Sequence, residues 1–168
     1  KDDQPIAEQF EQVEMRLVDL ATGQYTTELD PASFDPADAA RDPELGMAIP
    51  SEKDIAGLKR RSKYGLVYLV MQGEDIRYII LPVSGYGLWS TMYGYLALES
   101  DANRVAGLRF YQHAETPGLG AEIDNAKWLA QWQGKHVFDQ QGNPAIEVIR
   151  GPVAITAAVV VGCYSQQR

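Results

Sequence analysis

The sequence contains one cysteine, two histidines and no long uninterrupted apolar run. The single Cys163 excludes an internal disulfide and gives no indication of a redox compartment. His113 and His136 have no second ligand at a spacing that suits a metal, so we interpret both as ordinary strand or surface residues. The apolar stretch Ala154–Tyr164 has eleven residues, well short of the roughly 20 that a membrane helix needs.

Positive charge is also scarce: the sequence has 15 Lys and Arg residues but 23 Asp and Glu residues, which gives a net charge of −8. An anionic protein repels phosphate backbones and anionic lipid, which argues against nucleic acid and against a basic membrane-binding patch as partners. The 168 residues are 45% hydrophobic and 23% charged. This composition predicts a single globular domain over residues 1–168 with a sizeable core.

Several common catalytic and metal-binding motifs are missing. Gly85-Tyr86-Gly87 is not a dinucleotide fingerprint, because Ser90 replaces its third glycine and a strand pattern follows. No Ser-His-Asp order and no G-x-S-x-G elbow is present. Three pairs of carboxylates lack EF-hand spacing, and we interpret them as solvated: Asp2 with Asp3, Asp35 with Asp38, and Asp42 with Glu44.

Alternating, β-branched and aromatic residues predict an antiparallel sheet. The expected strands are Met15–Leu20, Gly65–Met71, Ile76–Pro82, Tyr93–Leu98 and Val105–Gln112, followed by a hairpin of His136–Phe138 with Ile146–Ile149. Helical turns are expected around Asp35–Ala40, Asp42–Met47 and Ser51–Asp54, within or next to a long loop. Asp124-Asn125 should cap a helix that carries Trp128, Leu129 and Trp132 and ends at Gly134. The sequence predicts an α+β fold, a twisted mostly antiparallel sheet with flanking helices.

Two glycine-rich turns within Ser84–Ile123 are the most informative part of the chain. The first presents Leu88, Trp89 and Ser90, and the second is Thr116-Pro117-Gly118-Leu119-Gly120. Glycines let backbone approach a flat ring, hydroxyls and amides meet its polar edges, and Trp89 or Leu119 can cover a face. The turns therefore suit a flat aromatic ligand that carries a phosphate. Two ordinary hairpin turns are the alternative.

The amino-acid sequence of these turns resembles that of a known family. Gly85–Gly94 and Glu115–Gly120 are similar to the C subunit of the bacterial Na+-translocating NADH:quinone oxidoreductase. Lys127-Trp128 and Gln131–Lys135 extend the resemblance, which covers roughly Met15 to Val153. The second turn alone is shared with the G subunit of the Rnf electron-transport complex, which is one alternative. A cofactor-free periplasmic interaction module is the other.

The resemblance implies an electron-transfer flavoprotein, a subunit of an oxidoreductase that exports Na+. FMN would relay single electrons between other redox centres of the complex without a protein acid or base. The domain would lie on the periplasmic side of the bacterial inner membrane, beside the other subunits. One N-terminal membrane helix would precede it, and because this chain starts without methionine we expect the sequence to begin after that helix. The implied FMN-binding residues are Leu88, Trp89, Ser90, Glu115, Thr116, Gly118, Leu119, Gly120, Ala154, Ile155 and Thr156.

The acceptor of the flavin is where the chain departs from the family. Family members carry FMN as a phosphoester on the threonine of a Ser-Gly-Ala-Thr motif, before a last helix whose N-terminus favours phosphate. Residues 151–158 read Gly-Pro-Val-Ala-Ile-Thr-Ala-Ala instead. Either Thr156 is the acceptor, or Ile155 and Thr156 follow an acceptor that this sequence omits. The second alternative predicts an interruption at Val153–Ala154 or Ala154–Ile155.

Two further expectations concern the glycine turns. We expect the turns to lie together and to line one pocket. We also expect valine at Gly118 or Gly120 to disturb the flavin more than the fold, because φ > 0 strains a β-branched residue.

Overall fold

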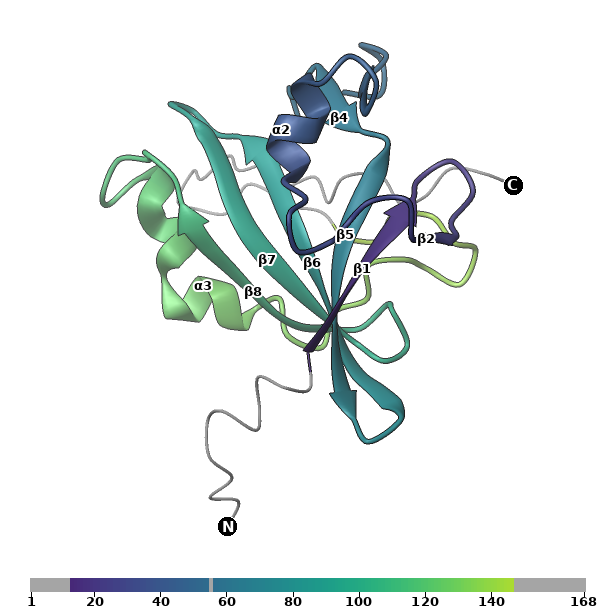
Figure 1. Ribbon diagram of the computed structural model, residues 1–168. Coiled ribbons are helices and arrows are strands. Elements are labelled where there is room, and N and C mark those ends of the chain that lie inside the picture. The colour runs from purple at the N-terminus through teal and green to yellow at the C-terminus, as the bar shows by residue number, and fades with distance from the viewer. Residues whose placement is uncertain (1–12, 55, 147–168) are drawn as a thin grey trace.

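The computed structural model describes residues 13–54 and 56–146. Its main sheet has six strands in the order β2-β1-β5-β6-β7-β8, and every pairing is antiparallel (Figure 1). The strands are β1 (Val13–Asp19), β2 (Tyr25–Thr26), β5 (Tyr64–Gln72), β6 (Asp75–Tyr86), β7 (Thr91–Glu99) and β8 (Val105–Gln112). A second, two-stranded sheet pairs β3 (Gly46–Ala48) with β4 (Arg60–Ser62). The α+β prediction is confirmed.

Three short helical segments accompany the sheets: α2 (Pro36–Arg41), the 3₁₀ helix η1 (Gly120–Asp124) and α3 (Ala126–Ala130). Figure 1 places α2 at one end of the main sheet and α3 beside β8. As predicted, Asn125 caps α3, since its side chain accepts a 2.9 Å hydrogen bond from the Lys127 amide. No helix among the described residues combines the length and the apolar character that a membrane crossing requires.

The core lies on one face of the main sheet. It joins side chains from β5 to β8 with residues that follow β8, among them Ile123 and Trp132. Leu96, at the centre of β7, is only 1% exposed. The helix that we expected to continue to Gly134 ends at Ala130. Trp132 lies in the turn that follows and is buried in the core. The chain then turns at Gly134, whose φ is +79°, as the sequence predicts.

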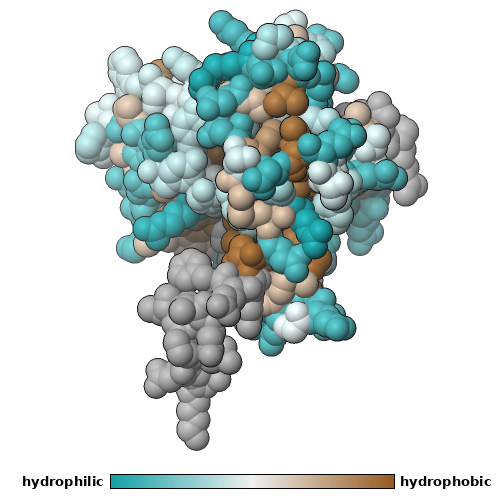
Figure 2. Space-filling model, viewed as in Figure 1, coloured by the Kyte–Doolittle hydropathy of each residue, from teal (hydrophilic) through white to brown (hydrophobic). Residues whose placement is uncertain are grey.

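The opposite face of the sheet bears a tyrosine cluster. Tyr95 stacks on Tyr111 with ring centres 5.1 Å apart, and Tyr68 meets Tyr95 edge-on at 6.1 Å. Partial burial, followed by the neighbouring tyrosines, raises the pKa of both Tyr68 and Tyr111. In the view of Figure 2, apolar side chains reach the surface in a strip down the middle of the molecule, flanked by hydrophilic residues.

The register of β6 and β7 positions the first glycine turn. The paired residues run from Tyr78 opposite Glu99 to Tyr86 opposite Thr91. This register leaves residues 87–90 as the connecting loop. Because Gln112 at the end of β8 pairs with Tyr93, the chain after β8 continues past that loop.

Strand β6 pairs with β5 along only the first half of its length. Its pairing with β5 ends at Ile80, while its pairing with β7 continues to Tyr86. The Tyr86 amide donates instead to the carbonyl of Ala56 at 2.9 Å, away from β7. Residues two apart in a strand share a direction, so Pro82 also has its nitrogen on the side away from β7. This is where a strand tolerates a missing N–H group.

Two expected helical turns are wrong. Asp42–Met47 is a turn followed by β3, because the Asp42 carboxylate accepts the amides of Glu44 and Leu45 and closes a turn instead of a helix. These hydrogen bonds also lower the pKa of Asp42. Ser51–Asp54 likewise forms a turn, whose Lys53 amide donates to the Pro50 carbonyl.

The predicted last hairpin is only partly described. Its turn forms around Gly142, and Phe138 bridges to Pro144. Most of its second strand, Ile146–Ile149, lies outside the described residues, and so do Ala154–Tyr164 and Cys163.

Candidate functional site

The β6–β7 loop is a closed turn that is tied to the chain after β8. The Gly87 amide donates to the Ser90 carbonyl at 2.8 Å, which closes the loop. The Ser90 hydroxyl accepts a 3.0 Å hydrogen bond from the Ala114 amide, just before the second glycine turn. This confirms the expectation that the two turns lie together, while the expectation that they line one pocket stays a prediction.

The Glu115 carboxylate lies between the turns. Its residue is 9% exposed, and Oε1 accepts a 3.2 Å hydrogen bond from the Trp89 amide. A Cβ atom added to Gly87 would overlap Oε1, and one added to Gly120 would overlap Oε2. The close approach of one buried side chain thus favours glycine at both positions, most strongly at Gly120, where Glu115 Cβ also lies 2.9 Å away.

The second turn folds back on itself through Thr116. The Thr116 carbonyl accepts the amides of Leu119 at 3.0 Å and of Ala121 at 3.1 Å. Gly118 has φ of +75°, as the sequence predicts for this turn. Gly120 is not among the described glycines with positive φ, so strain was the wrong reason for its presence. Contact with Glu115 is the right one.

His113 braces the second turn, a role that sequence reasoning missed. Its Nε2 lies 2.8 Å from Asp124 Oδ2, and its Nδ1 accepts the Glu115 amide at 3.2 Å. Because Nδ1 accepts, we assign the proton to Nε2, which donates to Asp124. No sequence spacing signals this contact across eleven positions. The backbone of His136, in contrast, forms an isolated antiparallel β-bridge with Arg104 at the end of the sheet.

Replacing His113 by alanine should lower the free energy of unfolding by about 1–2 kcal/mol, because two hydrogen bonds of the turn are lost. His136→Ala is the matched control and should change it by less than about 0.5 kcal/mol. Urea unfolding of both variants measures the difference. Equal effects at the two positions would contradict the bracing role of His113.

Three large apolar side chains project from the two turns into solvent. The exposed fractions are 73% for Leu88, 64% for Trp89 and 62% for Leu119. Within the described residues, the amides of Leu88 and Gly118 donate no hydrogen bond. Exposed apolar side chains beside unused amides are typical of a surface that receives a flat, partly polar ligand.

The remaining predicted site residues cannot be placed against these turns. Ala154, Ile155 and Thr156 lie outside the described residues, as do the Val153–Ala154 and Ala154–Ile155 junctions.

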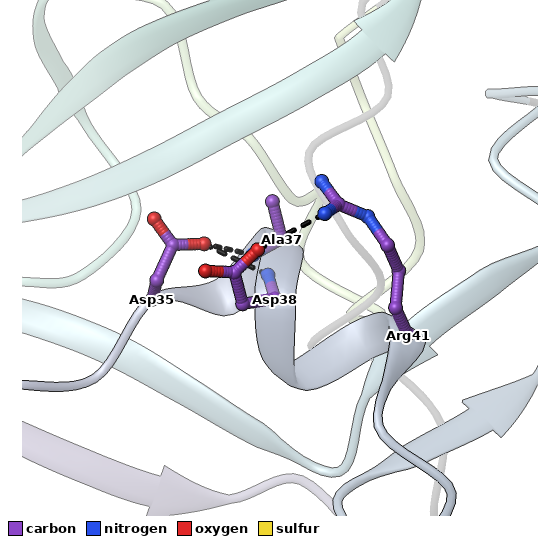
Figure 3. A network of polar contacts seen from close by, with 4 residues as sticks. All are labelled: Asp35, Ala37, Asp38 and Arg41. Atoms are coloured by element: carbon purple, nitrogen blue, oxygen red, sulfur yellow. Dashed lines mark hydrogen bonds and ion pairs between the residues drawn. The ribbon is translucent and has the colours of Figure 1, made fainter.

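A cavity of about 290 Å³ lies elsewhere, beside α2. Its wall includes Asp30, Asp35, Asp38 and Asp42. Figure 3 shows the structural roles of two of these acids: Asp35 caps α2 by accepting two amides at 2.8 Å, and Asp38 pairs with Arg41 at 3.0 Å. Four carboxylates repel an anionic ligand, so this cavity does not suit a phosphate. No group of three potential metal ligands occurs in residues 13–54 and 56–146.

The family model described as "FMN-binding domain" matches residues 87–158, from the first glycine turn onward. Among curated proteins, the C subunit of the Na(+)-translocating NADH-quinone reductase of Pseudomonas aeruginosa is 53% identical over 138 residues, 82% of this chain and 53% of that protein. The protein of the same name from Yersinia pestis is 46% identical over 140 residues, 83% of this chain and 52% of that protein. The chain spans about half the length of these relatives.

Solved structures extend the similarity to the fold. The crystal structure of Shewanella oneidensis NqrC aligns with a TM-score of 0.77 and 35% identity, over 88% of this chain and 68% of that one. The C subunit of the Na(+)-translocating NADH-quinone reductase from Parabacteroides distasonis aligns with a TM-score of 0.59 and 26% identity, over 82% of this chain and 58% of that one.

Proposed function

This chain belongs to the NqrC family, the C subunits of the Na+-translocating NADH-quinone reductases, and we propose that it carries FMN and relays single electrons in such an enzyme. The observation that carries the proposal is the meeting of the two glycine turns. Residues 87–90 and 116–120 are far apart in sequence, and hydrogen bonds from Trp89 to Glu115 and from Ala114 to Ser90 join them.

The side chains present at the turns fit an isoalloxazine ring. Leu88, Trp89 and Leu119 are mostly exposed, and burying them against a flat aromatic ligand would remove apolar surface from water. The amides of Leu88 and Gly118 have no partner in the described part of the chain and can donate to polar ring edges. The fit rests on neutral donors and apolar contacts, which hold a ring without moving a proton.

Bound FMN would supply the redox chemistry, and the protein would hold and tune it. Leu88, Trp89 and Leu119 would cover the ring and exclude water from it. His113 would not act as an acid or base, because both of its ring nitrogens are engaged by Asp124 and Glu115. His113→Ala should therefore leave flavin reduction intact although it weakens the turn.

The proposal extends to how FMN is attached to the chain and to the complex that surrounds the domain. We propose a phosphoester between FMN and a threonine, with Thr156 as the candidate present in the sequence. The partners would be the other subunits of a membrane complex in the bacterial inner membrane. The domain would lie on the periplasmic side of this membrane and would follow an N-terminal membrane helix in the sequence. The names of the relatives and the FMN-binding family model support the complex and the cofactor.

The test is the visible spectrum of the chain produced in a host that assembles this kind of complex. We expect a yellow protein whose flavin stays with the polypeptide after denaturation and precipitation. Thr156→Ala should abolish covalent flavin, whereas Thr22→Ala, at an exposed threonine near β1, should not. Flavin that washes away on denaturation would contradict the phosphoester. A protein with no flavin at all would favour the interaction module, and covalent flavin in Thr156→Ala would place the acceptor elsewhere.

A further inference from the structure

Glu115 stands out because it is a buried acid without a cationic partner. Ser62 and Glu115 are the buried polar residues of the described chain, and Glu115 takes part in none of its ion pairs. A buried carboxylate is costly unless hydrogen bonds replace its hydration. Its position therefore needs a reason beyond packing.

The two oxygens of Glu115 face different turns. Oε1 accepts the Trp89 amide at 3.2 Å and occupies the space where Gly87 would carry a side chain. Oε2 and the side-chain stem occupy the equivalent space at Gly120. The carboxylate thus spans the gap between the two turns, which carry the exposed Trp89 and Leu119.

We propose that Glu115 is a positioning residue for the flavin, an assignment that rests on the proposed function. By bridging the turns it fixes the spacing between Trp89 and Leu119, the two side chains that would flank the ring. Aspartate is one methylene shorter and would not reach the Trp89 amide from the same backbone. Glutamine has the same shape and still offers an acceptor, but it carries no charge.

The charge of Glu115 gives the proposal a second, separable consequence. Reduction of a bound flavin adds electron density to the ring, and a fixed carboxylate nearby in a low-dielectric setting opposes that addition. Glu115 would therefore hold the midpoint potential below the value that a neutral side chain would give. Removing the charge while keeping the shape should shift the potential in the positive direction.

The bridge is tested first on the flavin-free chain, by hydrogen exchange of the Trp89 amide. Glu115→Ala should speed this exchange by about tenfold, because the amide loses a charged acceptor. Glu115→Gln retains the acceptor and should speed the exchange of the Trp89 amide less than Glu115→Ala does. This variant still tests the bridge if Glu115→Ala does not fold. Glu99→Gln, at the far end of β7 where Glu99 faces Arg104 at 3.9 Å, is the matched control. Unchanged exchange in both Glu115 variants would overturn the bridge.

The charge is tested on the flavin-loaded chain, by spectroelectrochemical titration. We expect a more positive midpoint potential in Glu115→Gln and an unchanged one in Glu99→Gln. A potential equal to that of the unmodified chain would overturn the electrostatic part. A chain that takes up no flavin would overturn both the proposed function and the role toward flavin, while the amide exchange would still decide the bridge.

Discussion

Replacing Leu96 by alanine should lower the free energy of unfolding by about 3 kcal/mol, within the range of about 2–5 kcal/mol for fully buried leucines. Leu96 is 1% exposed and packs at the centre of the sheet-face core. Its truncation removes contacts on all sides and leaves a cavity that the two neighbouring strands cannot close. Urea unfolding of the purified domain, with the slope compared as well as the midpoint, measures the loss.

Leu88→Ala is the matched control for Leu96→Ala, since the same atoms are removed from a side chain that is 73% exposed. We expect it to change the free energy of unfolding by less than about 0.5 kcal/mol. It should instead alter the flavin spectrum, because Leu88 would lie against the ring. Similar losses of stability in the two variants would contradict the assignment of core and site.

Valine at Gly120 should disturb Glu115, whereas valine at Gly118 should not, although both glycines belong to one turn. An added Cβ at Gly120 would overlap Glu115 Oε2 and lie 2.9 Å from Glu115 Cβ. Overpacking of this kind costs about 1–3 kcal/mol and would push the two turns apart. At Gly118 nothing lies within 4 Å, so only the strain of φ at +75° remains, about 1–2 kcal/mol.

The two valine variants also differ in what they do to the site. Gly120→Val should free the Trp89 amide from Glu115 and change the flavin spectrum, whereas Gly118→Val should leave the bridge in place. Hydrogen exchange of the Trp89 amide and the flavin spectrum distinguish the two outcomes. A larger spectral change in Gly118→Val would show that backbone strain, and not Glu115, governs this turn.

Most of the fold could be predicted from short-range sequence patterns. The strands around Tyr68, Leu81, Leu96 and Leu108 alternate or consist of β-branched and aromatic residues, and all of them form. The helical turn at Asp35–Ala40 also forms as α2, because Asp35 and Pro36 supply a side-chain cap and a fixed φ at its start. These signals lie within a few residues of the structure that they determine.

Long-range contacts could not be predicted in the same way. Asp42–Met47 has helix-compatible residues, but Gly46–Ala48 pairs with β4, more than ten positions later. The link between Ser90 and Ala114 and the contact of His113 with Asp124 also depend on how β7 and β8 align. The sequence indicated the two glycine turns, which the structure brings together. It did not show that a buried carboxylate joins them.

Pro82 has a consequence for aggregation. Beyond Ile80 no described strand pairs with β6 on the side away from β7, and an unpaired strand side is a template onto which a foreign chain can add. Strand addition needs alternate N–H groups along that side, and proline removes one of them. Pro82 therefore disfavours strand addition along the part of β6 between Ile80 and Tyr86, whose own amide is bound to Ala56.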